Sequence, residues 1–328
     1  MDALLGRISE LYGITFSQVP ERIAKGVLSE NYSLVSNKGK LFLKKYRFES
    51  ENRIREIHSA KQYFADSSIP VILPIRASHD STFFFFNGSF YALFPFVFGK
   101  HIEREELTDH AVTSMGEMLG RIHLAGGDST ISIVEDFFSS WDKNAFDIKV
   151  AEILEKMLST EERNNFDKLA YESIRLKKSL VEKNSIQYEG LGFKSDHLIH
   201  GDYLDHNVFF NNADEVEHVF DFEKTQYSPR TFELFRSLMY SLLSSGTSES
   251  DLQKARVYLD AYRATYPIEN EELKRGLEMF YLKSIHSVWV EHEHYVKGNF
   301  RPDLFLEPDF KRLQFLSNNL DNLARALF

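Results

Sequence analysis

The chain of 328 residues contains no cysteine, and this absence narrows both its chemistry and its surroundings. Disulfide bonds, thiolate nucleophiles and zinc sites built on thiolates are all excluded. A chain without disulfides fits a reducing compartment, so we expect a cytoplasmic protein. Proline and glycine are scarce as well, with 8 and 16 residues, and this composition argues against long disordered segments.

The sequence also lacks long apolar runs and an excess of basic residues. The longest apolar stretch, residues 90–98, is far too short to span a bilayer and contains Pro95, so we expect no membrane segment. The formal net charge is −10, which argues against nucleic acid as a partner. An acidic surface would suit a cationic substrate, although many soluble proteins are acidic. The motif G-x-x-x-x-G-K-[ST] does not occur, so a P-loop nucleotide site is excluded.

Apolar and aromatic residues, in contrast, are plentiful. They make up 43% and 14% of the chain, which is long enough to build two sizeable cores. Strand-like runs come before residue 100, and Asn87-Gly88 between residues 81–86 and 89–94 is a strong hairpin signal. From Thr108 onward, apolar residues follow helical spacing. We therefore expect a small sheet joined to a larger helical region.

One polar segment stands out, at residues 200–210 with the sequence HGDYLDHNVFF, and an acidic stretch follows at residues 219–223. Phosphoryl transfer needs a carboxylate that orients the attacking hydroxyl and accepts its proton, and Mg²⁺ that holds the phosphates. Asp202 suits the first role. Asn207 and Asp221 offer the oxygen ligands that Mg²⁺ prefers. Their spacing matches the H-x-D-x-x-x-x-N and D-F-x segments of kinase catalytic loops.

A simpler interpretation stays open, because Asp and Asn in a glycine-containing loop are common turn residues. Asp221, flanked by Phe220 and Phe222, also fits the exposed face of an edge strand. Against this interpretation, the polar segment is followed by an apolar run, a short polar turn and an apolar strand that leads into Asp221. This combination favours a catalytic site over a plain hairpin.

These segments resemble the aminoglycoside phosphotransferase and choline kinase family, which includes type II homoserine kinases and spore-coat or stress-response kinase-like proteins. His-Gly-Asp at residues 200–202, in place of His-Arg-Asp, is typical of it. The resemblance implies an α+β, protein-kinase-like fold, with a nucleotide-binding lobe at residues 1–95 and a helical lobe at residues 96–328. It further implies ATP and Mg²⁺ as cofactors. The implied acceptor is a hydroxyl of a small molecule, such as an aminoglycoside, an amino alcohol or homoserine.

The same resemblance assigns two charged residues to the phosphates. Lys44, in the strand-like run 41–46, would hold the α- and β-phosphates, and Glu56 of the following helix would pair with it. Lys45 and Glu51 are the competing choices. Alternation along a strand puts Lys44 and Lys45 on opposite faces, so only one of them can serve. Ordinary solvated charges remain the alternative for both acidic residues.

Further nucleotide contacts are implied around the sheet. Gly26 and Asn31 resemble a reduced phosphate loop with one glycine and one asparagine. A glycine in a strand turn also has a purely structural explanation. Phe94 and Phe96 fall where the family has its hinge between lobes, whose backbone groups recognise adenine.

The acceptor would meet residues of the larger lobe. Asp205 and Glu223 flank the expected catalytic groups, and an extended chain would put Glu223 on the same face as Asp221. A single long helix is expected over residues 271–297, on which Trp289 and Glu293 share one face and would suit a cationic substrate. A solvated helix face beside one structural tryptophan explains this pair equally well.

Two other features of the larger lobe carry expectations. Ser159 to Glu162 has the pattern of a capping box, which predicts the start of a helix that runs to about Lys183. His123 follows the apolar positions of a helix that begins near Thr108, and we expect it to be a structural histidine.

Two rival functions stay open. A protein Ser/Thr kinase of the stress-response branch would share the fold, but the activation loop and Ala-Pro-Glu motif of ordinary protein kinases do not occur here. A non-catalytic pseudokinase would bind nucleotide alone, although none of the expected catalytic residues is missing. The sequence leaves the acceptor, the choice between ATP and GTP, and the oligomeric state open.

Overall fold

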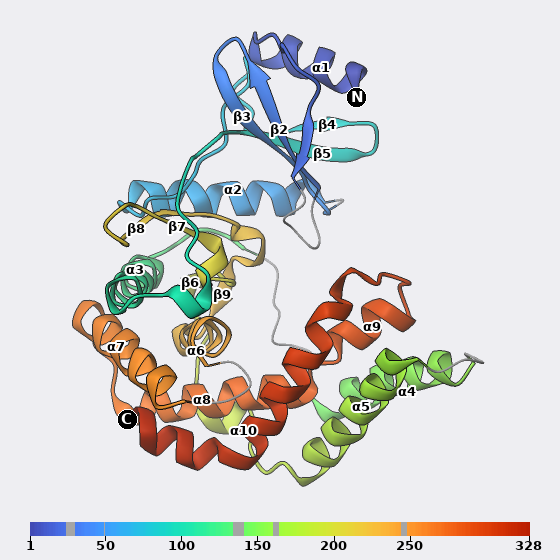
Figure 1. The fold of residues 1–328 in the computed structure, drawn as a ribbon, viewed down its shortest axis with the longest axis vertical. Coiled ribbons are helices and arrows are strands. Elements are labelled where there is room, and N and C mark those ends of the chain that lie inside the picture. The colour runs from blue at the N-terminus through green and yellow to red at the C-terminus, as the bar shows by residue number, and fades with distance from the viewer. Residues whose placement is uncertain (24–29, 49, 134–140, 160–163, 244–247) are drawn as a thin grey trace.

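The chain folds into two lobes, which the computed structural model describes over residues 1–23, 30–48, 50–133, 141–159, 164–243 and 248–328 (Figure 1). The smaller lobe is built on an antiparallel sheet with the strand order β1-β2-β3-β5-β4. Its elements are α1 (Asp2–Tyr12), β1 (Glu21–Ile23), β2 (Glu30–Ser36), β3 (Gly39–Lys45), α2 (Glu51–Asp66), β4 (Phe84–Phe86) and β5 (Ser89–Pro95). The remainder is mostly helical, so the expected α+β fold is confirmed.

The sheet of the smaller lobe separates two apolar layers, because side chains alternate along its strands. Leu41 and Leu43 of β3 are buried in a cluster with residues of α1. Phe42 and Tyr46 belong to a different cluster, which includes a residue of α2. Lys44 lies between these two aromatic residues and therefore shares their face. The alternation predicted from the sequence is the one that forms.

The hairpin of β4 and β5 turns at Asn87 and Gly88. Their φ angles are 44° and 78°, and a type I′ turn requires positive φ at both positions. Phe86 pairs with Ser89 across the turn. The predicted hairpin is thus confirmed, although β4 is shorter than the run of residues 81–86.

The larger lobe combines helices with two small antiparallel pairs of strands, β6 with β9 and β7 with β8. Its elements are η1 (Arg104–Glu106), α3 (Asp109–Gly127), α4 (Lys143–Leu158), α5 (Asn165–Lys183), η2 (Glu189–Leu191), β6 (His197–Ile199), η3 (Asp205–Asn207), β7 (Val208–Phe210), β8 (Val216–Val219), η4 (Phe222–Lys224), β9 (Gln226–Ser228), α6 (Arg230–Ser241), α7 (Glu249–Thr265), α8 (Asn270–His286), α9 (Trp289–Tyr295), η5 (Arg301–Phe305) and α10 (Leu306–Leu327). Within the described ranges, no helix has both the length and the apolar character that crossing a bilayer would require.

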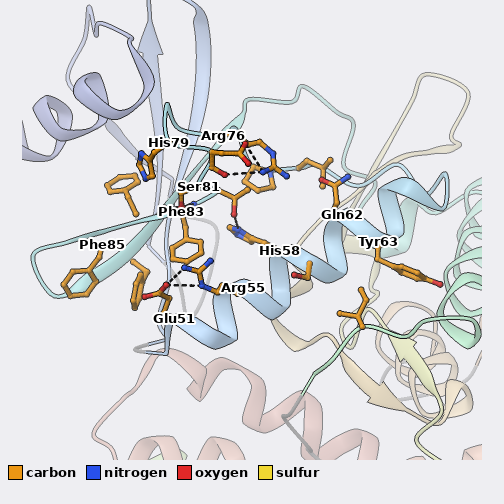
Figure 2. A pocket seen from close by; sticks show the side chains of 18 of the residues that line it. Glu51, Arg55, His58, Gln62, Tyr63, Arg76, His79, Ser81, Phe83 and Phe85 are labelled. Carbon is orange, nitrogen blue, oxygen red and sulfur yellow. Dashed lines mark hydrogen bonds and ion pairs between the residues drawn. The ribbon is translucent and has the colours of Figure 1, made fainter.

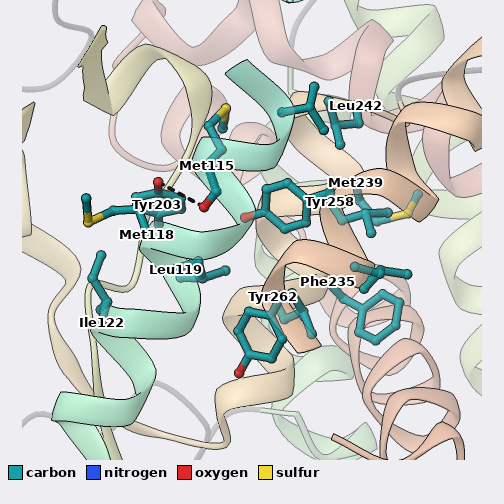
Figure 3. Packing of buried hydrophobic residues seen from close by; sticks show 14 of the residues in the cluster. Met115, Met118, Leu119, Ile122, Tyr203, Phe235, Met239, Leu242, Tyr258 and Tyr262 are labelled. Atoms are coloured by element: carbon teal, nitrogen blue, oxygen red, sulfur yellow. Dashed lines mark hydrogen bonds between the residues drawn. The ribbon is translucent and has the colours of Figure 1, made fainter. Parts of the chain in front are cut away.

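The core of the larger lobe forms where α3, α6 and α7 meet (Figure 3). Met115 of α3, Phe235 of α6 and Tyr258 of α7 are all fully buried there. Tyr203, from the polar segment, enters the same core, and its hydroxyl donates to the carbonyl of Met115 at 3.1 Å. The segment expected to be catalytic is therefore anchored in the buried core of the lobe.

The start of α5 differs from the expectation. The side chain of Asn164 accepts from the Asp167 N–H at 3.1 Å, and the Asp167 carboxylate accepts from the Asn164 N–H at 2.8 Å. This pair is a complete capping box, so the box predicted at residues 159–162 is wrong. Ser159 instead ends α4, a helix that the sequence analysis did not predict. The Asn-x-x-Asp pattern satisfies the same unpaired N–H groups as Ser-x-x-Glu does.

The single helix predicted over residues 271–297 is also wrong, because α8 ends at His286 and α9 begins at Trp289. Ser287 between them is extended, with ψ of 114°. Near the end of α8, the side chains of Ser284 and His286 bond the carbonyls four residues earlier, at 2.7 and 2.8 Å. Such local side-chain bonds compete with regular helix geometry and favour a bend.

Candidate active site

The polar segment after β6 forms a loop whose path depends on Gly201. Its φ is +84°, and a Cβ at this position would lie 1.9 Å from the carbonyl oxygen of Lys224. A side chain does not fit in that space, and the left-handed backbone is strained for other residues. Glycine at this position allows the loop to lie directly against the turn that follows Asp221.

Glu233 of α6 holds this loop in place through hydrogen bonds. Its carboxylate is fully buried and accepts hydrogen bonds from the N–H groups of His200 at 3.0 Å and Tyr203 at 3.2 Å. The ring of His123 also contacts Glu233, at 3.1 Å, and is fully buried as expected of a structural histidine. The sequence analysis missed Glu233. Its only signal was an acidic residue beside Phe232 and Phe235, among the apolar residues of a helix.

The ring of His200 connects the loop to the strand that leads into Asp221. Nε2–H donates to the carbonyl of Phe220 at 2.8 Å, and Nδ1 accepts from the N–H of Asp202 at 3.1 Å. This tautomer is the neutral ring, and burial lowers the pKa of His200 accordingly. His200 is therefore a positioning residue that fixes Asp202 and Asp221 relative to each other.

Asp202 lies between two cations. Its carboxylate accepts from Lys224 Nζ at 2.8 Å and from Arg236 Nε at 3.0 Å. Burial alone would raise the pKa of Asp202, but the charges of Arg236 and Lys224 outweigh burial and hold that pKa well below its ordinary value. The side chain is thus a carboxylate throughout the neutral range, ready to accept a hydrogen bond from a hydroxyl.

The hairpin of β7 and β8 brings Asn207 and Asp221 to the same end of two paired strands. Val208 pairs with Val219, and the N–H of Phe220 donates to the carbonyl of Asn207 at 3.1 Å. The side-chain amide of Asn207 donates to the backbone carbonyl of Asp202 at 2.8 Å. That bond fixes the amide group and leaves its oxygen as the remaining ligand atom.

After β8 the chain turns sharply and does not stay extended. Asp221 has a left-handed φ of 65°, and the next residues form the 3₁₀ turn η4. The expected reason for placing Glu223 on the face of Asp221, an extended strand, is therefore wrong. Glu223 nevertheless lies near Asp221, because both carboxylates contact the same lysine.

That lysine is Lys44, whose Nζ lies 2.8 Å from Asp221 Oδ1 and 2.7 Å from Glu223 Oε1. Burial alone would lower the pKa of Lys44, but the two carboxylates raise it. Lys45 points to the other face of β3, where it pairs with Glu30 at 3.1 Å. The structure thus places Lys44, and not its neighbour, against the residue expected to hold the metal.

The expected pairing of Lys44 with Glu56 does not form. Glu56 contacts Arg53 at 3.2 Å, one turn earlier on α2. Arg53 in turn donates to the backbone carbonyls of Glu223 and Thr225, both at 2.8 Å. Arg53, the nearer cation, pairs with Glu56. The turn at η4 brings Glu223 to Lys44 in place of Glu56.

Asn31 lies directly opposite Lys44, on the neighbouring strand β2. Its side-chain oxygen is buried and has no hydrogen-bond partner among the residues that the structure describes. A buried acceptor of this kind is costly unless something donates to it. Asn31 therefore meets one requirement of a nucleotide contact, whereas Gly26 lies outside the described residues.

The two expected hinge residues have different surroundings. Phe94 is buried, with its ring edge against Phe42 at 6.2 Å between centroids. Phe96 is partly exposed beneath Lys40, whose Nζ lies 4.0 Å from the ring centroid. The N–H of Phe96 donates to the carbonyl of Lys40 at 3.3 Å, so this amide is already occupied.

The residues expected to contact the acceptor lie on different elements of the larger lobe. The N–H of Asp205 donates to the hydroxyl of Ser241 at 3.0 Å, and Glu293 bonds Lys297 and Asn299, both at 2.7 Å. Trp289 begins α9, and its indole N–H donates to Asp309 of α10 at 3.3 Å. Glu293 is thus engaged locally, whereas Trp289 reaches toward α10.

A separate hollow lies away from these residues. Its volume is about 1220 Å³, and α2, residues 73–85 and Ile131 form most of its lining (Figure 2). Glu51, the other acid considered for Lys44, lines this hollow and pairs with Arg55 at 3.0 Å. Glu51 is therefore occupied on the outer side of α2, and the hollow has no part in the site around Asp202.

Comparisons with known proteins identify the family of this chain. Residues 20–268 match the model of the phosphotransferase enzyme family. A homoserine kinase of Methylobacillus glycogenes is 23% identical over 276 residues, which is 82% of this chain and 74% of the relative.

Solved structures share the fold. A microcompartment-associated aminopropanol kinase has a TM-score of 0.66 at 11% identity, with 99% of both chains covered. A spectinomycin phosphotransferase in complex with ADP and spectinomycin has a TM-score of 0.63 at 16% identity, covering 99% of this chain and 98% of the other. The resemblance noted in the sequence is confirmed, and the chain belongs to the phosphotransferase enzyme family.

Proposed function

We propose that the protein transfers the γ-phosphoryl group of ATP to a hydroxyl group of a small molecule in a Mg²⁺-dependent reaction. The observation that carries the proposal is the grouping of Asp202, Asn207, Asp221 and Lys44 around one hairpin end, fixed by His200. The relatives named for homoserine and aminopropanol as substrates support a hydroxyl acceptor. The division at residues 95 and 96 into a nucleotide lobe and an acceptor lobe is part of this proposal.

Asp202 would orient the acceptor. Its carboxylate accepts a hydrogen bond from the attacking hydroxyl, whose oxygen forms a bond to the γ-phosphorus as the bond to the ADP oxygen breaks. The hydroxyl proton passes to Asp202. Because its pKa lies far below neutrality, Asp202 is a weak base, and we assign it mainly to orientation with late proton uptake.

Asn207 and Asp221 would hold the metal ion. Both present oxygen atoms, the Asn207 amide is fixed by its bond to Asp202, and the Asp221 side chain is 41% exposed. Among the described residues, no group of three or more histidine and carboxylate side chains forms a ready metal cage. Two protein ligands fit Mg²⁺, which usually retains waters and uses substrate phosphates for its other positions. Once bound, Mg²⁺ neutralises charge on the phosphates.

Lys44 would exchange its carboxylate partners for phosphate oxygens when the nucleotide binds. Its raised pKa keeps the ammonium charged, so it can pair with either. Asn31, opposite Lys44 with an unsatisfied buried oxygen, supports a ligand on this face of the sheet.

The test is release of ADP from MgATP, measured with and without each member of a panel of hydroxyl acceptors. We expect acceptor-dependent release that EDTA abolishes. Asp202→Asn should lower the turnover by about 10²–10⁴-fold, the usual effect of a positioned base, while ATP affinity stays nearly unchanged. Asp321→Asn on the exposed face of α10 is the control and should behave as wild type. Wild-type turnover in Asp202→Asn, or no acceptor-dependent ADP at all, would refute the proposal.

A further inference from the structure

Positive side chains gather on the helical side of Asp202. Lys224 follows the η4 turn and Arg236 lies on α6, and both contact the Asp202 carboxylate directly. Two more cations come from α8, which packs against α6, and from α10, which packs against α8. We refer to the four as the cation cluster: Lys224, Arg236, Lys283 and Arg312.

The ring of Tyr240, on α6, links three members of this cluster. The guanidinium carbons of Arg312 and Arg236 lie 4.0 and 4.8 Å from its centroid, and Lys283 Nζ lies 6.0 Å away. An aromatic face attracts cations, so one ring can gather charges that otherwise repel each other. Lys283 is also close enough to Lys224 to affect its ionisation. The cluster is therefore one continuous group that extends from the catalytic carboxylate.

The cluster carries more positive than negative charge. Lys224 and Arg236 share the single carboxylate of Asp202, and Arg312 pairs with Asp309 at 2.6 Å. Lys283 has neither a hydrogen bond nor an ion pair among the residues that the structure describes, and its side chain keeps partial exposure. Burial and the neighbouring Arg236 lower the pKa of Lys283 to about 7. An ammonium in such surroundings needs an anion to balance it.

We propose that the cation cluster binds an anionic group of the acceptor, so that the molecule phosphorylated is a hydroxyl compound that also carries a carboxylate or a phosphate. This inference rests on the proposed function, because the acceptor hydroxyl must reach Asp202. On the helical side of Asp202, Lys283 is the member of the cluster that follows Lys224 and Arg236. The net acidic charge of the chain suggested a cationic substrate, and the local charge at the site reverses that suggestion.

The phosphates of ATP are not the anion that this cluster serves. Lys44 approaches Asp221 from the sheet, whereas Lys283 and Arg312 approach from α8 and α10. Lys44 and the cation cluster therefore belong to different substrates. A change at Lys283 should alter the KM of the acceptor and leave the KM of ATP unchanged.

The first experiment compares matched acceptors with the full chain and MgATP, measured as ADP formation. The matched pairs, with and without an anionic group, are L-homoserine and its amide, glycerate and glycerol, and glucose 6-phosphate and glucose. Choline and spectinomycin are cationic probes without such a group. We expect the member with the anionic group to exceed its partner by at least about 10-fold in kcat/KM, the effect of one charge-assisted hydrogen bond. The pairs also separate a carboxylate from a phosphate.

Two outcomes of this comparison would overturn the inference. Turnover confined to neutral or cationic acceptors would overturn the inference while the proposed function stands. No ADP with any acceptor would overturn the proposed function and this inference with it.

The second experiment tests Lys283 itself with the anionic acceptor that is turned over. Lys283→Met keeps the length of the side chain and removes its charge, and we expect a rise of about 10- to 100-fold in acceptor KM. Lys283→Arg should restore most of the affinity. Lys274→Met is the matched control, since Lys274 is exposed on the same helix. An unchanged acceptor KM in a folded Lys283→Met protein would refute the assignment.

Discussion

The pKa of a lysine is shifted in opposite directions on the two sides of the site. On the sheet side, Lys44 contacts two carboxylates, which raise its pKa above the ordinary value. On the helical side, Lys283 contacts no carboxylate among the described residues, and burial beside Arg236 lowers its pKa to about 7. Burial lowers the pKa of both lysines, so the opposite directions of the two shifts come from the neighbouring charges.

This difference indicates where each side obtains its balancing charge. The sheet side carries its own carboxylates, so an incoming phosphate has to compete with Asp221 and Glu223 for Lys44. The helical side has an excess of cations, so the balancing anion has to come with a ligand. The two sides of the site can therefore bind different anions. On the sheet side the charge of Lys44 is already balanced by carboxylates, whereas on the helical side the cations are not fully balanced.

Among the changes that test this comparison of the two lysines, removing Lys44 has the largest expected effect. Lys44→Met should lower kcat/KM for ATP by about 10²–10³-fold, since an electrostatic donor to the transferring phosphates is usually worth that much. Lys45→Met is the matched control on the adjacent residue, and it should be nearly neutral because Lys45 pairs with Glu30 on the other face. Steady-state kinetics with varied ATP measures both. If Lys45→Met is instead the variant with the low kcat/KM, the phosphate-binding role has been assigned to the wrong lysine.

A smaller effect is expected when Asp221, the partner of Lys44, is removed. AMP-PNP with Mg²⁺ at about 100 times its dissociation constant should stabilise the wild-type protein by about 2.7 kcal/mol, and Mg²⁺ alone should stabilise it hardly at all. Asp221→Ala should lose most of the metal-dependent part. Thermal unfolding with and without EDTA measures this difference.

Asp321→Ala is the control for that experiment, because Asp321 is exposed on α10. Equal metal-dependent stabilisation in Asp221→Ala and wild type would show that Asp221 does not hold the ion. The sheet side would then be an internal ion pair without a metal site.

The sequence predicted the sheet side far better than the helical side, and the reason is physical. The resemblance to the family selected Lys44, and alternation along one strand separated it from Lys45. Asn207 and Asp221 were selected by the spacing of the polar segment and the strand that follows it, which is also a local pattern. Gly201 was visible in the sequence as part of His-Gly-Asp, although its close approach to Lys224 depends on a distant turn. Local patterns are what a single sequence expresses most clearly.

Contacts between distant helices were not predictable in this way. Glu233, Arg236 and Lys283 lie on helices whose apolar spacing looks ordinary, and nothing in that spacing shows which polar residue will face Asp202. The pairing of Glu56 with Lys44 failed for a different, local reason, since Arg53 three residues earlier on the same helix is a nearer partner. Competition among several charges is decided by tertiary packing, which a sequence pattern does not contain.

The smallest expected effect is a pH dependence that belongs to the helical side alone. The groups that interact electrostatically with Lys283 are Arg236 and Tyr240 of α6, Asp309 and Arg312 of α10, Lys177 of α5 and Lys224 of η4. Together with burial, the excess of cations keeps its pKa near 7 in the free protein. The ammonium is therefore charged below pH 7 and loses its proton as the pH rises through that value.

An anionic acceptor binds the charged form, so its KM should be lowest below pH 7 and rise by up to about 10-fold per pH unit above it. The KM of ATP should stay flat over the same range, because the raised pKa of Lys44 keeps that ammonium charged. Initial rates between pH 6 and pH 8.5 with both substrates varied give the two profiles. Lys283→Met should flatten the acceptor profile at a high KM, and any pH dependence that remains in this variant would come from other groups. A wild-type acceptor profile that is already flat would show that Lys283 does not contact the acceptor anion.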